Sequence, residues 1–275
     1  MKNILLLTDF SKNAKNAIEY ALQLLKNDEC VFYLLYVHKA STFSSDNLIA
    51  SARTSIYESI VKKPKEKLKL LMEEFQNEND KHAFHTIVDF DSFTASINQI
   101  IRQKKIELIV IGTNGVTGAK EVIFGSNTIN VIRKVNCTTL VIPEGFKFSH
   151  LRELLLPLSP NDSFSGVHIN ELLKFVSTYK SGLHILRIAN EEEKVNFNVN
   201  DRKDISGLLE ASTYKYSFIS HIPIHYAVDN YIQNNAIDIA VLFVQKENFI
   251  DRFFKGSKTT DISNTIRVPL LVIHR

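Results

Sequence analysis

The sequence predicts two tandem α/β domains, each a five-stranded parallel open sheet flanked by helices. Two observations predict this fold class: the chain contains a long internal repeat, and within each copy short apolar runs alternate with segments of helical period. The length of 275 residues accommodates two domains of ordinary size. We therefore expect a first domain over residues 1–144 and a second, degenerate domain over residues 151–275.

The repeat is clearest in the later part of each copy. Residues 96–107 resemble residues 227–238 at an offset of 131. The offset holds without a gap for three further pairs: Leu108–Ile111 with Ile239–Leu242, Gly125-Ser126 with Gly256-Ser257, and Leu140–Ile142 with Leu271–Ile273. Near the start of each copy, residues 4–7 align with residues 154–157 at an offset of 150. The difference places extra residues in the first copy, around residues 43–75.

Each copy supplies five candidate strands. In the first they are residues 3–8, 31–37, 84–88, 107–111 and 138–142, and in the second 152–157, 183–188, 217–224, 238–244 and 269–273. Between them, apolar side chains recur at three- and four-residue steps, as in Ala14, Ala17, Ile18, Ala21, Leu22 and Leu25. These stripes predict helices that face the core. Pro143 and Gly145 indicate a linker over residues 143–150.

A glycine-rich segment follows the fourth run of the first copy. Gly112-Thr113-Asn114-Gly115 is followed, after nine residues, by Gly125-Ser126-Asn127-Thr128. Glycines after a parallel strand let backbone amides approach a phosphate closely. Ser126 precedes a segment of helical period and is placed to cap a helix, whose amino end favours an anion. A plain strand-to-helix turn with a serine cap is the alternative for a single glycine pair.

The three glycines, with a strand before and a helix after, resemble the nucleotide loop of the universal stress protein family, written G-x2-G-x9-G-[ST]. Residues 7–11 at the end of the first strand and residues 35–37 at the end of the second resemble two further motifs of that family. The resemblance covers the whole first half. It implies two domains of the adenine nucleotide alpha hydrolase-like fold and a protein that binds adenine nucleotides in stress-response signalling.

The resemblance also implies roles for individual residues. Asp9 and Val37 match family positions that contact the adenosine end of ATP. The family positions that hold the ribose and phosphates correspond here to Gly112, Gly115, Gly125, Ser126, Asn127 and Thr128. Asp9 could instead cap the first helix. The expected ligand is ATP, ADP or AMP, with or without Mg²⁺, and a cyclic nucleotide also stays open. Independently of the family, open α/β sheets bind ligands beyond the carboxyl ends of their strands, where Asp9 and Gly112 are both expected to lie.

The second copy departs from the nucleotide motif. Phe243 stands opposite Gly112, Lys246 opposite Gly115, and Ser159 opposite Asp9. A phenyl ring where the backbone should meet a phosphate would obstruct the ligand. We therefore expect one nucleotide site per chain, in the first domain, although Lys246, Lys255 and Lys258 could attract a small anion.

Composition excludes several other classes. The net charge of +3 and the acid-interrupted stretch 62–67 do not predict a nucleic-acid surface. No apolar run is long enough for a membrane span, so we expect a cytoplasmic protein. Cys30 and Cys137, the two cysteines, lie beside apolar runs and are expected to be buried, reduced thiols.

Catalysis has little support in the sequence. The glycine loop offers Lys120 and Glu121 but no Gly-Lys-Ser motif, so any ATP hydrolysis should be slow. We expect no metal site, because the histidine pairs His82/His85 and His221/His225 lie in strand-like surroundings. A slow ATP-hydrolysing or nucleotidyl-transfer enzyme, and a structural dimerisation module independent of nucleotide, are the alternative functions.

The last strand of each copy is expected to be a sheet edge. In single-domain members of the family this strand pairs with that of a partner, which removes the exposed edge. Residues 140–142 and 271–273 could pair in the same way within one chain. The sequence thus predicts an intramolecular pseudo-dimer, and a homodimer through other surfaces stays open.

Overall fold

The computed structural model describes residues 1–38, 61–113, 125–159, 162, 164, 166–189, 213–244 and 267–274. These residues form two compact units. The first contains residues 1–113 and 125–148, and the second begins at Ser149. Both units are α/β structures with a parallel sheet, as the sequence predicts.

The first unit contains the strands β1 (Lys2–Leu7), β2 (Cys30–Val37), β3 (His82–Asp89), β4 (Leu108–Gly112) and β5 (Thr139–Ile142). Within this unit they are ordered β3-β2-β1-β4-β5, and every adjacent pair is parallel. The chain leaves β1 for β2 on one side and later returns to β4 on the other. The strand order therefore reverses at β1, which is where open α/β sheets bind ligands.

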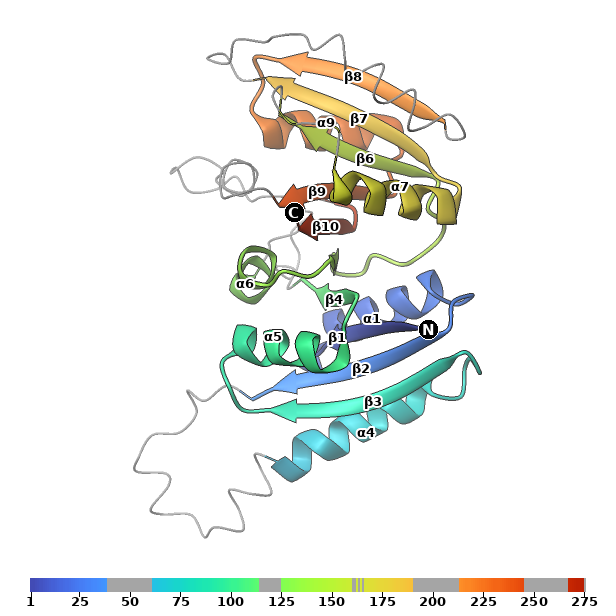
Figure 1. Ribbon diagram of the computed structural model, residues 1–275, viewed down its shortest axis with the longest axis vertical. Helices are drawn as coiled ribbons and strands as arrows, with labels where there is room; N and C mark the ends of the chain where they lie inside the picture. The colour runs from blue at the N-terminus through green and yellow to red at the C-terminus, as the bar shows by residue number, and fades with distance from the viewer. Residues whose placement is uncertain are drawn as a thin grey trace. The chain divides into compact units, whose positions relative to one another are not determined.

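In the described part of the first unit, helices cover both faces of this sheet. Helices α1 (Lys12–Leu24) and α4 (Lys63–Phe75) lie on one face, and α5 (Phe93–Lys104) and α6 (Ser126–Lys134) lie on the other (Figure 1). The predicted stripe of α1 is buried. The expected linker also packs on α1, because Tyr20 contacts Phe148 with the ring centroids 5.3 Å apart.

The second unit repeats the plan with β6 (Glu153–Leu158), β7 (Gly182–Ala189), β8 (Tyr214–Ser220), β9 (Ile239–Val244) and β10 (Leu270–His274). Within this unit the order is β8-β7-β6-β9-β10, again parallel. Helices α7 (Val167–Tyr179) and α9 (Ile224–Asn235) lie on opposite faces (Figure 1).

The expected strand over residues 217–224 is wrong at its end. Strand β8 stops at Ser220, and residue 224 already begins α9. His221 has a φ of 65°, a left-handed conformation that a strand does not contain. Pro223, with no N–H to give to a strand, is the N-cap of α9.

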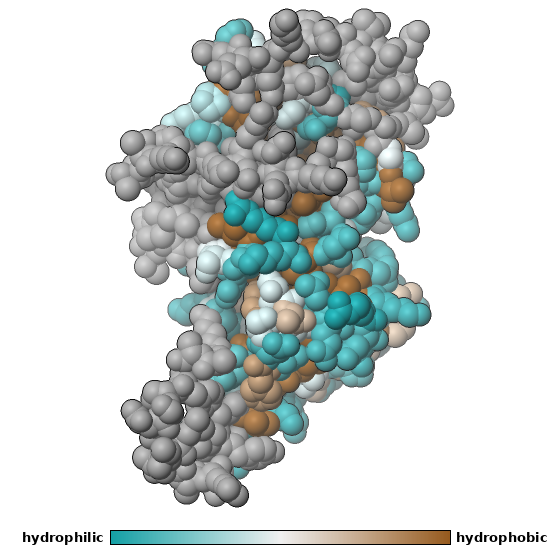
Figure 2. Space-filling view, turned by 60° about the vertical axis from the view of Figure 1, so that its left-hand side comes forward, coloured by the Kyte–Doolittle hydropathy of each residue, from teal (hydrophilic) through white to brown (hydrophobic). Residues whose placement is uncertain are grey.

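The interior and the surface are those of an ordinary globular chain. Leu5, Leu6, Leu154 and Leu155 are fully buried, and Cys30 and Cys137 are buried free thiols, as expected. On the face drawn in Figure 2, hydrophobic residues of the described parts are scattered among hydrophilic ones. Among the helices that the structure describes, none has the length and apolar character needed to cross a bilayer.

Candidate functional site

The carboxyl edge of the first sheet brings most of the predicted site residues to one place. Val37 is the last residue of β2, Gly112 is the last residue of β4, and Asp9 follows the intervening strand β1 by two residues. Helix α6 begins beyond the same edge. Gly115 lies outside the described residues, as do Lys120 and Glu121.

Gly112 is a glycine because α1 packs directly against it. A Cβ on Gly112 would lie 2.6 Å from the carbonyl oxygen of Asn13 and 3.3 Å from the backbone nitrogen of Ala14. Both atoms belong to the first turn of α1, and no side-chain movement could relieve that contact. Gly112 thus fixes the amino end of α1 against β4, a packing role that the sequence reading of a phosphate loop did not include.

Asp9 turns the chain into α1 but does not cap the helix. Its Oδ1 accepts a hydrogen bond from the Ser11 N–H at 3.0 Å, and the Ser11 hydroxyl accepts one from the Ala14 N–H at 3.1 Å. Ser11 is therefore the N-cap, and the helix-cap alternative for Asp9 is wrong. Asp9 is exposed, which leaves its carboxylate accessible to a ligand at the edge.

The start of α6 differs from the expected serine cap. Gly125 is the N-cap, Ser126 is the first helical residue, and the helix has no side-chain capping hydrogen bond. Ser126 and Asn127 are exposed, whereas Thr128 is 3% exposed and faces the sheet. No side chain of the described residues caps the first amides of this helix, and the helix dipole favours an anion there.

Sequence reasoning missed an aromatic cluster beside these residues. Phe10 has a φ of 65°, its ring lies 4.8 Å from that of Tyr36, and the Lys67 ammonium from α4 lies 5.4 Å from the Phe10 centroid. Nothing in the local pattern signals this contact, because α4 is far from Phe10 along the chain. The exposed lysines of α4 thus include one that approaches the edge of the site.

The corresponding edge of the second unit is filled by side chains. Phe243, opposite Gly112 in the repeat, is 4% exposed, and its ring meets that of His168 in α7 at 4.7 Å. Four residues, 8–11, separate β1 from α1, whereas eight, 159–166, separate β6 from α7. The longer connection is consistent with an α7 that begins later and makes room for the phenyl ring.

A buried arginine lies near this filled edge. Arg187 of β7 is 2% exposed, and its Nη1 donates to the carbonyl oxygens of Ser159 and Asp162, both at 2.6 Å. Ser159, opposite Asp9 in the repeat, gives its backbone N–H to the Asp162 carboxylate at 2.8 Å. The connection between β6 and α7 is therefore tied to β7 by the protein's own groups.

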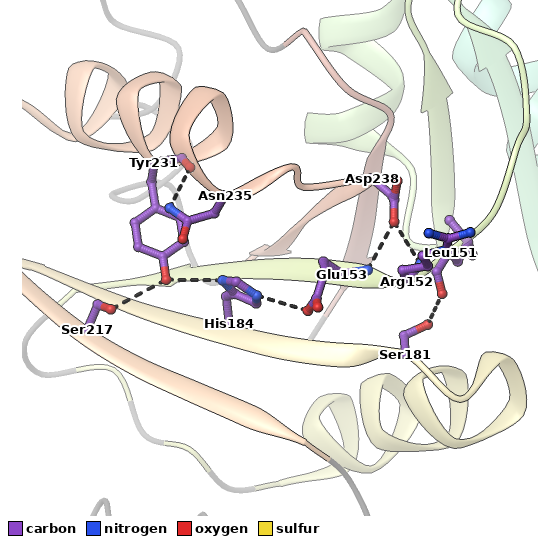
Figure 3. Close-up of polar contacts among 9 residues, drawn as sticks. All are labelled: Leu151, Arg152, Glu153, Ser181, His184, Ser217, Tyr231, Asn235 and Asp238. Atoms are coloured by element: carbon purple, nitrogen blue, oxygen red, sulfur yellow. Dashed lines mark hydrogen bonds and ion pairs between the residues drawn. The ribbon is translucent and has the colours of Figure 1, made fainter.

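A hydrogen-bonded network lies at the other, amino edge of the second sheet (Figure 3). His184 Nε2 lies 2.9 Å from the Glu153 carboxylate, and Nδ1 lies 3.1 Å from the Tyr231 hydroxyl on α9. Gly182 makes room for the carboxylate, since a Cβ there would lie 2.3 Å from Glu153 Oε2. Ser217 of β8 contacts the same hydroxyl at 3.4 Å.

This network stabilises the fold of the second unit and lies away from the carboxyl edge of its sheet. His184 is 1% exposed, and its burial lowers the pKa of the imidazole, although the hydrogen bond to Glu153 acts in the opposite direction. The neutral ring then donates from Nε2 to Glu153 and accepts from Tyr231 at Nδ1. His184 thereby links β6, β7 and α9.

The described residues contain no group of three or more His, Cys, Asp or Glu side chains that could hold a metal ion. His82 and His85 instead pack against the rings of Phe32 and Tyr33, at 4.9 and 5.3 Å between centroids.

Comparison with known proteins identifies the family. The model of the universal stress protein family matches residues 1–143. Universal stress protein MJ0577 of Methanocaldococcus jannaschii is 31% identical over 154 residues, which cover 51% of this chain and 94% of that protein. A crystal structure of a universal stress protein from Archaeoglobus fulgidus matches 99% of this chain and 98% of its own, with a TM-score of 0.72 at 17% identity.

A second structure, from Pseudomonas aeruginosa, matches 100% of this chain and 93% of its own with a TM-score of 0.62 at 12% identity. At such identities these two whole-chain matches establish the fold. They cover both halves of the chain, whereas MJ0577 covers one domain's length. The chain therefore belongs to the universal stress protein family, as a member with two tandem domains.

Proposed function

We propose that the first domain binds one adenine nucleotide at the carboxyl edge of its sheet, and that the protein acts as a nucleotide-dependent binding or signalling module in the stress response. The start of α6 carries this proposal. It presents amides without a side-chain cap beyond β4, at the edge that Asp9 and Val37 also occupy. The family resemblance supplies adenine as the base.

We assign each predicted residue a part in this site. Asp9 and Val37 would hold the adenosine end, and Gly125, Ser126, Asn127 and Thr128 would hold the ribose and phosphates. Gly112 would act indirectly, because its lack of a side chain lets the first turn of α1 pack against β4 at Asn13. The assignment of Gly115 rests on the sequence motif alone.

The second domain is proposed to bind no nucleotide in this manner. Phe243 and His168 pack against each other near the corresponding edge, and Arg187 engages the carbonyl oxygens of Ser159 and Asp162. A ligand would have to displace these contacts. We therefore expect the second domain to contribute shape and stability while the first binds the ligand.

Calorimetric titration of the full chain with ATP, ADP, AMP and cyclic AMP tests the proposal. We expect one site per chain. Asp9→Asn keeps an oxygen that can accept from the Ser11 N–H but loses the charge, and should weaken binding about tenfold, as removal of a charged hydrogen-bond partner does. Mass spectrometry of ligand released from the purified protein would identify the resident nucleotide.

The matched control is Asp162→Asn, which alters the similar turn in the second domain, where the carboxylate accepts from the Ser159 N–H. It should leave the affinity for nucleotide unchanged. Two equal sites per chain, or no binding of any adenine nucleotide, would contradict the proposal.

An enzyme acting at the same site is the second candidate. Incubation of the purified protein with ATP separates the two, because a binding module keeps ATP intact over hours, whereas an enzyme releases ADP or AMP with turnover. The third candidate, a structural module, requires that a bulky residue at position 115 leave cellular phenotype unchanged.

A further inference from the structure

A buried hydroxyl at the end of β4 has no hydrogen-bond partner among the residues that the structure describes. Thr113 directly follows Gly112, its side chain is 0% exposed, and its Oγ1 atom lacks a donor or acceptor. Burial removes the water that would otherwise bind the hydroxyl, and a buried hydroxyl without a partner costs free energy. Some group other than the described residues should therefore satisfy Oγ1.

The direction of the Thr113 side chain follows from the strand. Its backbone N–H still donates to the Ile142 carbonyl oxygen of β5 at 2.9 Å, so the ladder continues through this residue. Successive residues of a strand face opposite sides. Because the Cβ position of Gly112 meets α1 at Asn13, Thr113 faces the other side, which α5 and α6 cover (Figure 1).

The register places Val37 on that same face. Leu5 pairs with Tyr33 on β2 and with Ile109 on β4, so these three residues share one face of the sheet. Steps of two residues lead from Tyr33 to Val37 and, along the other strand, from Ile109 to Thr113. The unpaired hydroxyl, the proposed adenosine contact and the amino end of α6 therefore lie on one side of the sheet.

We propose that the Thr113 hydroxyl donates a hydrogen bond to a phosphate oxygen of the nucleotide bound in the first domain. This inference rests on the proposed function. A phosphate fits better than a base or a ribose, because α6 begins without a side-chain cap on that face and its dipole favours an anion. A hydroxyl that donates to a charged oxygen forms one of the stronger hydrogen bonds in proteins.

Thr113→Val tests the inference, because valine keeps the branched shape and loses only the hydroxyl. The substitution should have opposite effects on the two states. The unliganded protein should gain a few degrees in melting temperature, because an unpaired buried hydroxyl is removed. Its affinity for ATP should fall about tenfold, and its affinity for adenosine, which has no phosphate, should not change. Thr113→Ser should retain the affinity for ATP.

Thr139→Val is the matched control, since Thr139 is also fully buried but its hydroxyl already donates to the Cys137 carbonyl oxygen at 2.9 Å. This variant should melt at a lower temperature and bind ATP as the native protein does. Unchanged ATP affinity in Thr113→Val, or an equal loss of affinity for ATP and adenosine, would overturn the inference. If the native protein bound no adenine nucleotide, the proposed function itself would fail. That result differs from the two outcomes above, in which the native protein still binds ATP.

Discussion

The position that a Cβ on Gly112 would take lies 2.6 Å from the carbonyl oxygen of Asn13, inside the first turn of α1. Backbone atoms of a packed helix cannot rotate away, so an added methyl group must displace α1 or β4. We expect Gly112→Ala to destabilise the first domain by about 1–3 kcal/mol, the usual cost of overpacking. Nucleotide binding should weaken as well, because Asp9 lies on the turn that leads into α1. Urea unfolding and calorimetric titration measure the two effects.

Gly182→Ala provides the contrast for that variant. Its Cβ would meet the Glu153 carboxylate, which ends a flexible side chain that is partly exposed. Glu153 can turn toward solvent at the loss of its contact with His184, which should cost about 1 kcal/mol in the second domain. ATP binding should be unaffected. An equal loss of ATP affinity in both glycine variants would contradict the role given to Gly112.

The sequence predicted the central strands well because parallel strands buried on both faces are continuous apolar runs, whereas the bounds of the less buried β8 were partly wrong. The repeat offset also paired Gly112 with Phe243 correctly, since Phe243 is in register with Ile273 on β10 just as Gly112 is in register with Ile142 on β5. What the sequence could not provide were contacts between distant segments. The packing of Gly112 on Asn13 depends on where α1 lies, and the approach of Lys67 to Phe10 depends on where α4 lies.

Helix ends were the weaker part of the sequence reading. Ser126 and Asp9 both have side chains that can cap a helix, but Gly125 and Ser11 hold the cap positions. Which residue caps a helix depends on where the backbone changes from extended to helical conformation, and the sequence does not locate that change to a single residue. The proposed function depends on the start of α6, because no side chain of the described residues caps its first amides.

Tyr231→Phe should destabilise the second domain. The variant removes the hydroxyl that lies 3.1 Å from His184 Nδ1 and leaves that buried nitrogen without its partner. We expect a loss of about 1–3 kcal/mol. Tyr226→Phe on the same helix is the control, because Tyr226 is 46% exposed and water can replace its contacts. Chemical denaturation of both variants measures the difference, and equal unfolding free energies would contradict the network.

Acid should destabilise the second domain before the carboxylates titrate. Burial lowers the pKa of His184, and burial also lowers the pKa of His274 to about 4. In the unfolded chain a histidine takes up its proton near pH 6.5. Between those values the unfolded state binds more protons than the folded state, so the free energy of unfolding falls as the pH falls from about 6.5 toward about 4.

Urea unfolding from pH 7.5 to pH 4.5 measures this dependence. His184→Gln should flatten the slope, even if it lowers stability at every pH, because a group that titrates differently in the two states is removed. A slope that is the same in His184→Gln and in the native protein would show that His184 does not contribute to it.

Ser11 and Ser126 precede or begin helices at the same edge of the first sheet, but only Ser11 caps its helix. Ser11→Ala should lower stability by about 1 kcal/mol, because the Ala14 N–H loses its acceptor. Ser126→Ala should leave stability almost unchanged, because its exposed hydroxyl forms no capping bond. If Ser126 contacts a phosphate, the same variant should lower the affinity for ATP severalfold. A loss of affinity without a loss of stability would identify Ser126 as a ligand contact, whereas unchanged ATP affinity in Ser126→Ala would remove it from the proposed site.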